Sequence, residues 1–532
     1  MEESTQNQAQ YKRQQSSSIF RGDVILWATG MVFIFALLAA MFGFGHVRQW
    51  DAQSGYTHNQ SATSQTRFLP EPVEPEPGVA GRSDPSASGR WYYWQLPPEK
   101  VTAWSRIFVW LCYIGHQLTI WGTIYYAQRK KTSADFSGPK YSKQISVFNI
   151  VPFLLNIIFH VLHLAQTHIT YDALAQDVSE ASSQGSVIMM LVLVLLMEYR
   201  DRGLFFGWPT AQHKDKISRK LRFSQAPINL VRKYHGYAFS WAVIYTFWYH
   251  PMENTWGHAF GFIHTWMVML QGSLMYTSLH RNRIWRLVLE SWVTLHGLIV
   301  AKQTGGPDLN GTALWPMFCF GFLWLFTMTQ LFGLTFWKKA PWWTKAIPFL
   351  CYLAVCVWCY SWIPDKNGNY FVRLQEIIRI PAIEYICVIF AWFVIDMFLR
   401  IKTKLTSTEE RSASPSPFWE TFCIGCFMLI YSLMVLVSFL LQEFDLTLDL
   451  IALMVILVFI FILGTGLSFM IIEPVMKKRS GKTQATEYSK SVGMANTTGD
   501  VSAEYPSDDQ SDMTKKYAPT NDGNNAAFQS DH

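Results

Sequence analysis

The chain has 532 residues, of which half are hydrophobic, 16% are aromatic and 15% are charged. Ordinary soluble domains carry about 25% charged residues, so this composition excludes a soluble fold and predicts an all-α integral membrane protein in a lipid bilayer. The net charge of +6 is modest, and the basic residues stand in short clusters between apolar runs without forming a stripe. That distribution argues against nucleic-acid binding.

The N-terminal part predicts a membrane anchor followed by a polar loop. Residues 1–23 are polar and are expected in the cytoplasm, and the apolar run 24–45 lacks a small-residue cleavage site, as expected of a first transmembrane anchor. Residues 46–102 are polar and rich in Pro and Glu, which favours an extended or disordered extracytoplasmic loop. The Asn59 sequon lies on this loop and is a predicted glycosylation site.

Eleven further apolar runs complete a predicted bundle of about twelve spans, since a spanning helix needs about 20 apolar residues. They form a His-rich transmembrane bundle, 103–302, and a second transmembrane bundle, 303–476, and the polar remainder, 477–532, is a predicted disordered cytoplasmic tail. The predicted spans are 103–127, 145–166, 185–199, 228–249, 258–279, 285–302, 313–336, 346–363, 380–400, 417–441 and 448–472.

The charges between the spans predict that both termini are cytoplasmic. Loops 128–144 and 200–227 are strongly basic, whereas segment 169–184 is acidic and contains no Lys or Arg. Lys and Arg collect in cytoplasmic loops, and the alternation continues along the chain. A second sequon, at Asn310, falls on a predicted outer loop, and two outward sequons favour the plasma membrane or a secretory-pathway membrane.

Histidine is the most informative residue type in this sequence. Most of the fourteen histidines lie between His116 and His296, and an ionisable residue inside a bilayer is a functional candidate by default. His160, His264 and His296 each lie six residues from the outer end of a predicted span, about 9 Å below the membrane boundary. We therefore expect these three imidazoles at one level of the outer leaflet.

Helical spacing groups further polar residues with these histidines. Asn156 and His163 share one face of the third span with His160, and Gln271 lies two turns after His264 on the sixth. Such stripes should face protein or water instead of lipid. The predicted ligand or ion pathway consists of Asn156, His160, His163, His264, Gln271 and His296.

The same histidines allow two other interpretations. Neutral imidazoles suit Zn, Cu, Fe and Ni, and pairs of them can ligate haem iron, so a haem or a transition metal is a possible cofactor. A third interpretation is structural, with each imidazole donating a hydrogen bond between helices. The candidate metal or haem ligands are His160, His163, His264, His296, His250, His258, His235 and His280.

The remaining charged residues suggest less. Arg286 and Glu290 are four residues apart on one predicted helix and are expected to neutralise each other. Glu198 lies near an inner helix end, where water can solvate it.

The function is inferred from the predicted architecture, a bundle of about twelve spans, and not from a sequence motif. The chain has no G-x-x-x-x-G-K-S/T phosphate loop, and no motif identifies a catalytic residue. Twelve spans with short loops favour a transporter- or channel-like protein for a small solute or ion, by analogy of architecture. The alternatives are a transmembrane haem or metal oxidoreductase and a non-catalytic membrane protein with structural histidines.

Overall fold

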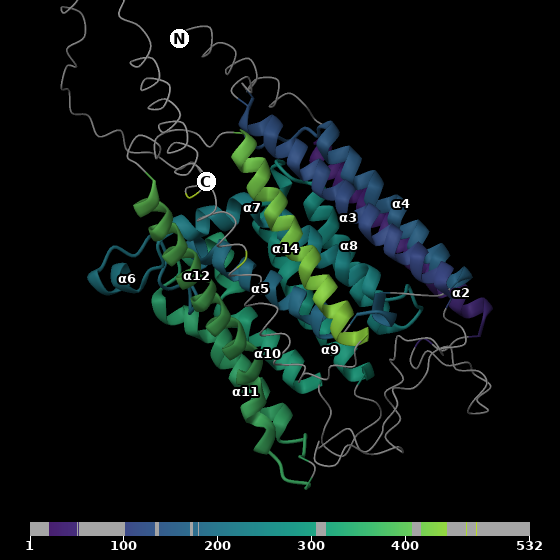
Figure 1. Ribbon diagram of the computed structural model, residues 1–532. Coiled ribbons are helices and arrows are strands. Elements are labelled where there is room, and N and C mark those ends of the chain that lie inside the picture. The colour runs from purple at the N-terminus through teal and green to yellow at the C-terminus, as the bar shows by residue number, and fades with distance from the viewer. Residues whose placement is uncertain are drawn as a thin grey trace, which may run out of the picture. The chain divides into compact units, whose positions relative to one another are not determined.

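The computed structural model describes residues 21–49, 52, 102–133, 138–170, 174–178, 180–304, 315–365, 367–406, 417–443, 464 and 475. Within these ranges the chain is helical and contains no strand (Figure 1). Nine of the helices described there are long and apolar enough to cross a membrane. The all-α, multi-pass membrane class that the composition predicts is therefore confirmed.

The α-helices are α2 (Gly22–Val47), α3 (Ala103–Thr132), α4 (Val147–Ile169), α5 (Glu180–Arg202), α6 (Lys216–Leu221), α7 (Gln225–Tyr249), α8 (Trp256–Ser273), α9 (Arg283–Thr304), α10 (Trp315–Met328), α11 (Ile347–Tyr360), α12 (Arg379–Leu405) and α14 (Pro417–Glu443). Short 3-10 segments are η3 (Leu174–Gln176), η4 (Leu279–Arg281), η5 (Gln330–Gly333), η6 (Thr335–Lys338), η7 (Trp342–Ala346) and η8 (Val372–Ile378).

Eleven predicted spans correspond to a helix, and the twelfth, 448–472, lies outside the described residues apart from Gly464. Helices α7 and α8 are not among the nine apolar ones, because polar residues such as Arg232 and Lys233 in α7 and His258 and His264 in α8 lower their mean hydropathy. The count of twelve spans and the orientation stay predictions. Asn59, Asn310 and the tail 477–532 also lie outside the described residues.

The predicted span 313–336 is wrong in its second half. Helix α10 ends at Met328 and is followed by the 3-10 segments η5 to η7. The Met328 carbonyl accepts a hydrogen bond from the Phe206 backbone N–H at 3.0 Å, and the Thr329 hydroxyl donates to the Leu325 carbonyl at 2.6 Å. The bond from Phe206 occupies the Met328 carbonyl, which a further α-helical turn would need.

The predicted span 258–279 is too long for a related reason. Helix α8 ends at Ser273, and the chain turns at Tyr276, which has a φ of 59°. The Tyr276 carbonyl accepts from the Ser142 backbone N–H at 3.1 Å, which ties this turn to the segment before α4. The polar groups of η4 are thereby placed beside the start of α9.

Helix α2 packs against α8 through a glycine. The Trp266 indole N–H donates to the Gly30 carbonyl at 2.8 Å, and a Cβ on Gly30 would lie 2.8 Å from both methyl carbons of Leu270. A larger residue at position 30 would therefore have to displace the Leu270 side chain from the α2 backbone. Figure 1 shows α2 running alongside α4 at the edge of the helices.

Hydrogen bonds at both ends of α2 define two ends of the bundle. Buried Asp23 accepts from the Leu279 backbone N–H at 3.0 Å, and its own N–H donates to the Lys143 carbonyl. At the opposite end, Arg48 donates to the His168 carbonyl at 2.9 Å. We call these the Gly22 end and the Val47 end; α2 and α4 run in the same direction between them, and α8 runs in the opposite direction.

The loop between α5 and α7 contains a pH-sensitive contact. The Nδ1 atom of His213 accepts from the Thr210 backbone N–H at 3.1 Å, which requires a neutral ring. Burial lowers the pKa of His213, the nearby Lys345 and Arg222 lower it further, and Asp215 partly offsets them. The folded loop therefore binds fewer protons than the unfolded loop, and its stability is present above the ordinary histidine pKa and is lost as the pH falls below it.

We expect this loop to be cleaved faster by a protease at about pH 5.5 than at about pH 7.5. His213→Gln should abolish most of that pH dependence, because Gln can accept the same bond without titrating. Exposed His46→Gln is the control and should keep it. Equal pH dependence of cleavage in wild type and His213→Gln would contradict the assignment.

Candidate functional site

Buried imidazoles tie together α3, α4 and α7. The Trp248 indole N–H donates to Nδ1 of His116 at 3.2 Å, so the proton of His116 lies on Nε2, which donates to Oδ1 of Asn156 at 2.9 Å. The amide of Asn156 donates in turn to the Ser273 hydroxyl on α8 at 3.3 Å. His116 and Asn156 thus bond neighbouring helices to one another.

His160 and His163 are fully buried beside this network. Nδ1 of His160 donates to the Asn156 carbonyl at 2.6 Å, and its ring packs on Phe247 with the centroids 4.3 Å apart. His163 donates through Nε2 to the His250 carbonyl at 2.7 Å. One imidazole nitrogen of each ring therefore forms a hydrogen bond with a backbone carbonyl.

The structure pairs His264 with His296, on α8 and α9, with ring centroids 5.8 Å apart. The ring of His160 packs instead on Phe247 and Trp266. A Cβ on Gly261 would lie 3.0 Å from Nε2 of His296. That nitrogen therefore faces the α8 backbone at van der Waals range, and a flat macrocycle has no space on this side of the ring.

His250 and His258 form a looser pair near the Val47 end. The rings of His250 and His258 have centroids 6.2 Å apart, and Nδ1 of His258 shares a hydrogen bond of 2.9 Å with the Thr255 hydroxyl that caps α8. Across the described ranges, no three or more His, Cys, Asp or Glu side chains are grouped so that they could hold a metal ion.

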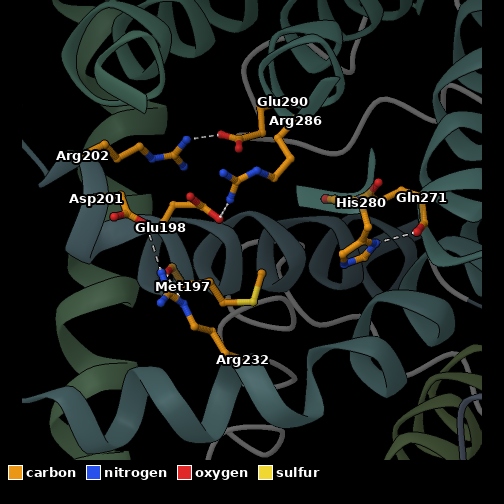
Figure 2. Close-up of polar contacts among 9 residues, drawn as sticks. All are labelled: Met197, Glu198, Asp201, Arg202, Arg232, Gln271, His280, Arg286 and Glu290. Carbon is orange, nitrogen blue, oxygen red and sulfur yellow. Dashed lines mark hydrogen bonds and ion pairs between the residues drawn. The ribbon is translucent and has the colours of Figure 1, made fainter. Parts of the chain in front are cut away.

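A second imidazole pair lies near the Gly22 end. The rings of His235, on α7, and His280, on η4, have centroids 6.2 Å apart. Each donates through Nδ1 to a backbone carbonyl at 2.9 Å, of Arg232 and Gln271 respectively, which leaves Nε2 as the acceptor atom. The Gln271 side chain donates to the His280 carbonyl at 2.9 Å and accepts from the Trp285 indole at 2.9 Å, so it bonds both η4 and α9. Figure 2 shows Gln271 beside His280.

Beside His280, charged side chains of α5 and α9 form two ion pairs (Figure 2). Nη1 of Arg202 donates to Oε2 of Glu290 at 2.6 Å, and these side chains are only 3% and 9% exposed. Arg286 pairs with Glu198 in the same way. Arg286 and Glu290, which the sequence groups, form no direct ion pair with each other: each of them reaches across to α5, and Arg286 acts on the Glu290 carboxylate without contacting it.

The chain places these charges by complementary spacing. Glu198 and Arg202 are four residues apart on α5, and Arg286 and Glu290 are four apart on α9 with the opposite order of charge. One face of each helix therefore presents one acid and one base to the other. This pattern is the sequence signal for the ion pairs.

A third arginine closes the network from α7. Arg232 donates through Nε and Nη2 to the Met197 carbonyl at 2.9 and 2.6 Å, and Nη2 lies 3.5 Å from Asp201 (Figure 2). The carboxylates of Glu198, Asp201 and Glu290 and the guanidinium groups of Arg202, Arg232 and Arg286 balance to zero net charge. We call these six residues the ionic network.

Glu290 of the ionic network lies well inside α9 and not at its end. Glu290 is seven residues after the start of α9, about 10 Å along its axis. His296 is six residues further, which places the His264–His296 pair about 9 Å beyond Glu290. Helices α8 and α9 thus carry polar groups at two successive levels.

Comparison with known proteins finds no family model, no curated protein and no solved structure that matches this chain. Its function is therefore argued from the arrangement of its own residues.

Proposed function

We propose that the chain is a transporter- or channel-like membrane protein whose path for an ion or small solute follows α5, α8 and α9. The observation that carries the proposal is the Arg202–Glu290 pair, a charged contact that is almost completely buried between two helices. Buried charges are costly in a bilayer and are mostly found along ion and solute paths. The His264–His296 pair supplies the next polar level. Asn156 and His163 stay outside this path, because their polar atoms bond neighbouring elements, and His160 is left out with them because its Nδ1 is bonded within α4.

The test measures the flux of protons, chloride, acetate and phosphate into lipid vesicles that contain the purified protein. We expect flux above that of protein-free vesicles, and a loss of about tenfold or more in the double variant His264→Ala/His296→Ala. Glu290→Gln should reduce the flux as well. His213→Ala, which changes a histidine of the α5–α7 loop, should leave it unchanged.

Flux that is equal in all variants would contradict the proposal, and so would the absence of flux for protons, for chloride and for the oxyanions acetate and phosphate. Absent flux together with lower stability of the histidine variants would favour a non-catalytic membrane protein with structural histidines. Stability and flux are therefore measured on the same preparations.

The second candidate is a haem or metal oxidoreductase, and a specific observation favours it. His235 and His280 both anchor Nδ1 on a carbonyl and keep Nε2 available, which is how metal-ligating histidines are usually held. An absorbance spectrum and a metal analysis of the purified protein decide this alternative. A Soret band that is lost in His280→Ala supports it, and colourless, metal-free protein rejects it.

A further inference from the structure

The guanidinium group of Arg202 uses only part of its bonding capacity. Nη1 donates to Glu290, while Nε and Nη2 are buried without a hydrogen-bond partner. The side chain is only 3% exposed, so bulk water does not supply the missing partners. Leaving buried donors unpaired is costly, so a ligand that accepts from both nitrogens would be stabilised there.

The two free N–H groups lie on one edge of the guanidinium plane. Nε and Nη2 point in parallel from the same side of the group, a spacing that matches two oxygen atoms of a carboxylate or a phosphate. A spherical ion such as chloride meets only part of that geometry. The free edge of Arg202 is thus shaped for a planar or tetrahedral oxyanion.

A second guanidinium group adds a further donor. Arg286 pairs through Nη1 with Glu198, and its Nε is also buried without a partner. Figure 2 shows the guanidinium groups of Arg202 and Arg286 approaching Glu290 from two sides, and both act on that carboxylate. An oxyanion beside Arg202 would therefore meet a second positive group.

Further positive charge lies near the start of α9. Arg283 begins α9 and lies near Lys338 of η6, and one guanidinium nitrogen of Arg283 is buried without a partner. Burial lowers the pKa of Lys338, the nearby Arg283 lowers it further, and Asp201 offsets part of the effect. Clustered positive charge raises the local concentration of anions.

We propose that the free edge of Arg202, assisted by Arg286, binds an oxyanion: the carboxylate or phosphate of a small solute, or the phosphate of a lipid headgroup. The inference deepens the proposed function by naming the class of solute, and it rests on that function only for the statement that the bound anion is carried. Binding itself is tested without transport.

The experiment measures the thermal midpoint of the purified protein in a neutral detergent. Sodium acetate, inorganic phosphate and a short-chain phosphatidate are each compared with sodium chloride at equal ionic strength. We expect at least one oxyanion to raise the midpoint by about 2–4 °C above chloride, since a ligand stabilises the state that binds it. Arg202→Lys keeps the charge but removes the two-donor edge, so it should lose more than half of that shift.

The matched control is Arg200→Lys, the same substitution at an exposed position of α5, which should keep the full shift. Should Arg202→Lys fail to fold, Arg286→Lys replaces it and should also reduce the shift. A response to phosphatidate alone assigns the anion to a lipid, and a response to acetate or phosphate assigns it to a solute.

The inference is overturned if no oxyanion exceeds chloride, or if the arginine variants of the ionic network shift as much as Arg200→Lys. The transport proposal fails separately. Oxyanion binding without flux into vesicles would support the binding site and reject the transport path. Flux without oxyanion binding would support the transport path and reject the binding site.

Discussion

Arg202→Met is expected to lower the free energy of unfolding by about 3–5 kcal/mol, since it leaves the Glu290 carboxylate buried without its cation. Glu290 has a side-chain exposure of 9%, so water cannot replace the lost partner. The second ion pair does not rescue it, because Arg286 is engaged with Glu198. Denaturant unfolding of the purified protein in detergent, followed by tryptophan fluorescence, measures the loss.

The double variant Arg202→Met/Glu290→Met distinguishes the loss of the whole ion pair from the loss of one partner. Removing both charges should restore most of the stability, because apolar residues of similar volume replace a buried ion pair at little cost. Arg200→Met is the control, and it should change stability by less than about 0.5 kcal/mol because its side chain is exposed. A double variant as unstable as the single one would refute this account of the pair.

Trp266→Ala is the second change with a large expected effect, about 3–5 kcal/mol, because it removes a fully buried aromatic side chain. The indole packs on Phe33 of α2 with centroids 4.6 Å apart and on Phe153 of α4 with centroids 6.0 Å apart. It also donates to the Gly30 carbonyl. The substitution therefore loosens α2 as well as leaving a cavity, and the unfolding midpoint of the purified protein measures the sum.

The control for this prediction is Trp104→Ala, at a tryptophan near the start of α3 that is 81% exposed. It should lower stability by less than about 0.5 kcal/mol in detergent. Trp266→Phe tests the hydrogen bond separately and should cost less than half as much as Trp266→Ala. Equal losses for the two alanine variants would show that burial at Trp266 does not hold α2.

Apolar runs predict where most helices lie, because the length of hydrocarbon fixes the length of a span. The run 24–45 corresponds to Gly22–Val47, and 417–441 corresponds to Pro417–Glu443. The end of α10 could not be found in this way, because it depends on the bond between the Phe206 N–H and the Met328 carbonyl, residues far apart in the chain. The composition of a segment indicates whether it lies in lipid or in water, but it does not indicate tertiary contacts such as this one.

The histidines were visible in the sequence, whereas the ionic network was not. The predicted span 185–199 ends three residues before Arg202, and its charge was counted with a basic cytoplasmic loop. In the structure α5 continues to Arg202. Arg202 therefore lies in the last helical turn, where it is a buried partner of Glu290, and not in a loop. The predicted span ends less than one helical turn before Arg202, and this small difference in the boundary separates a loop residue from a member of the ionic network.

The contacts of α2 bear on how the protein is assembled. Its anchoring bonds reach Trp266 and Leu279, which follow Gly30 and Asp23 by 236 and 256 positions. A ribosome makes α2 before Trp266 and Leu279, with several further helices in between. The newly made α2 consequently enters the bilayer before α8 exists, and its docking on α8 is a later step of biogenesis.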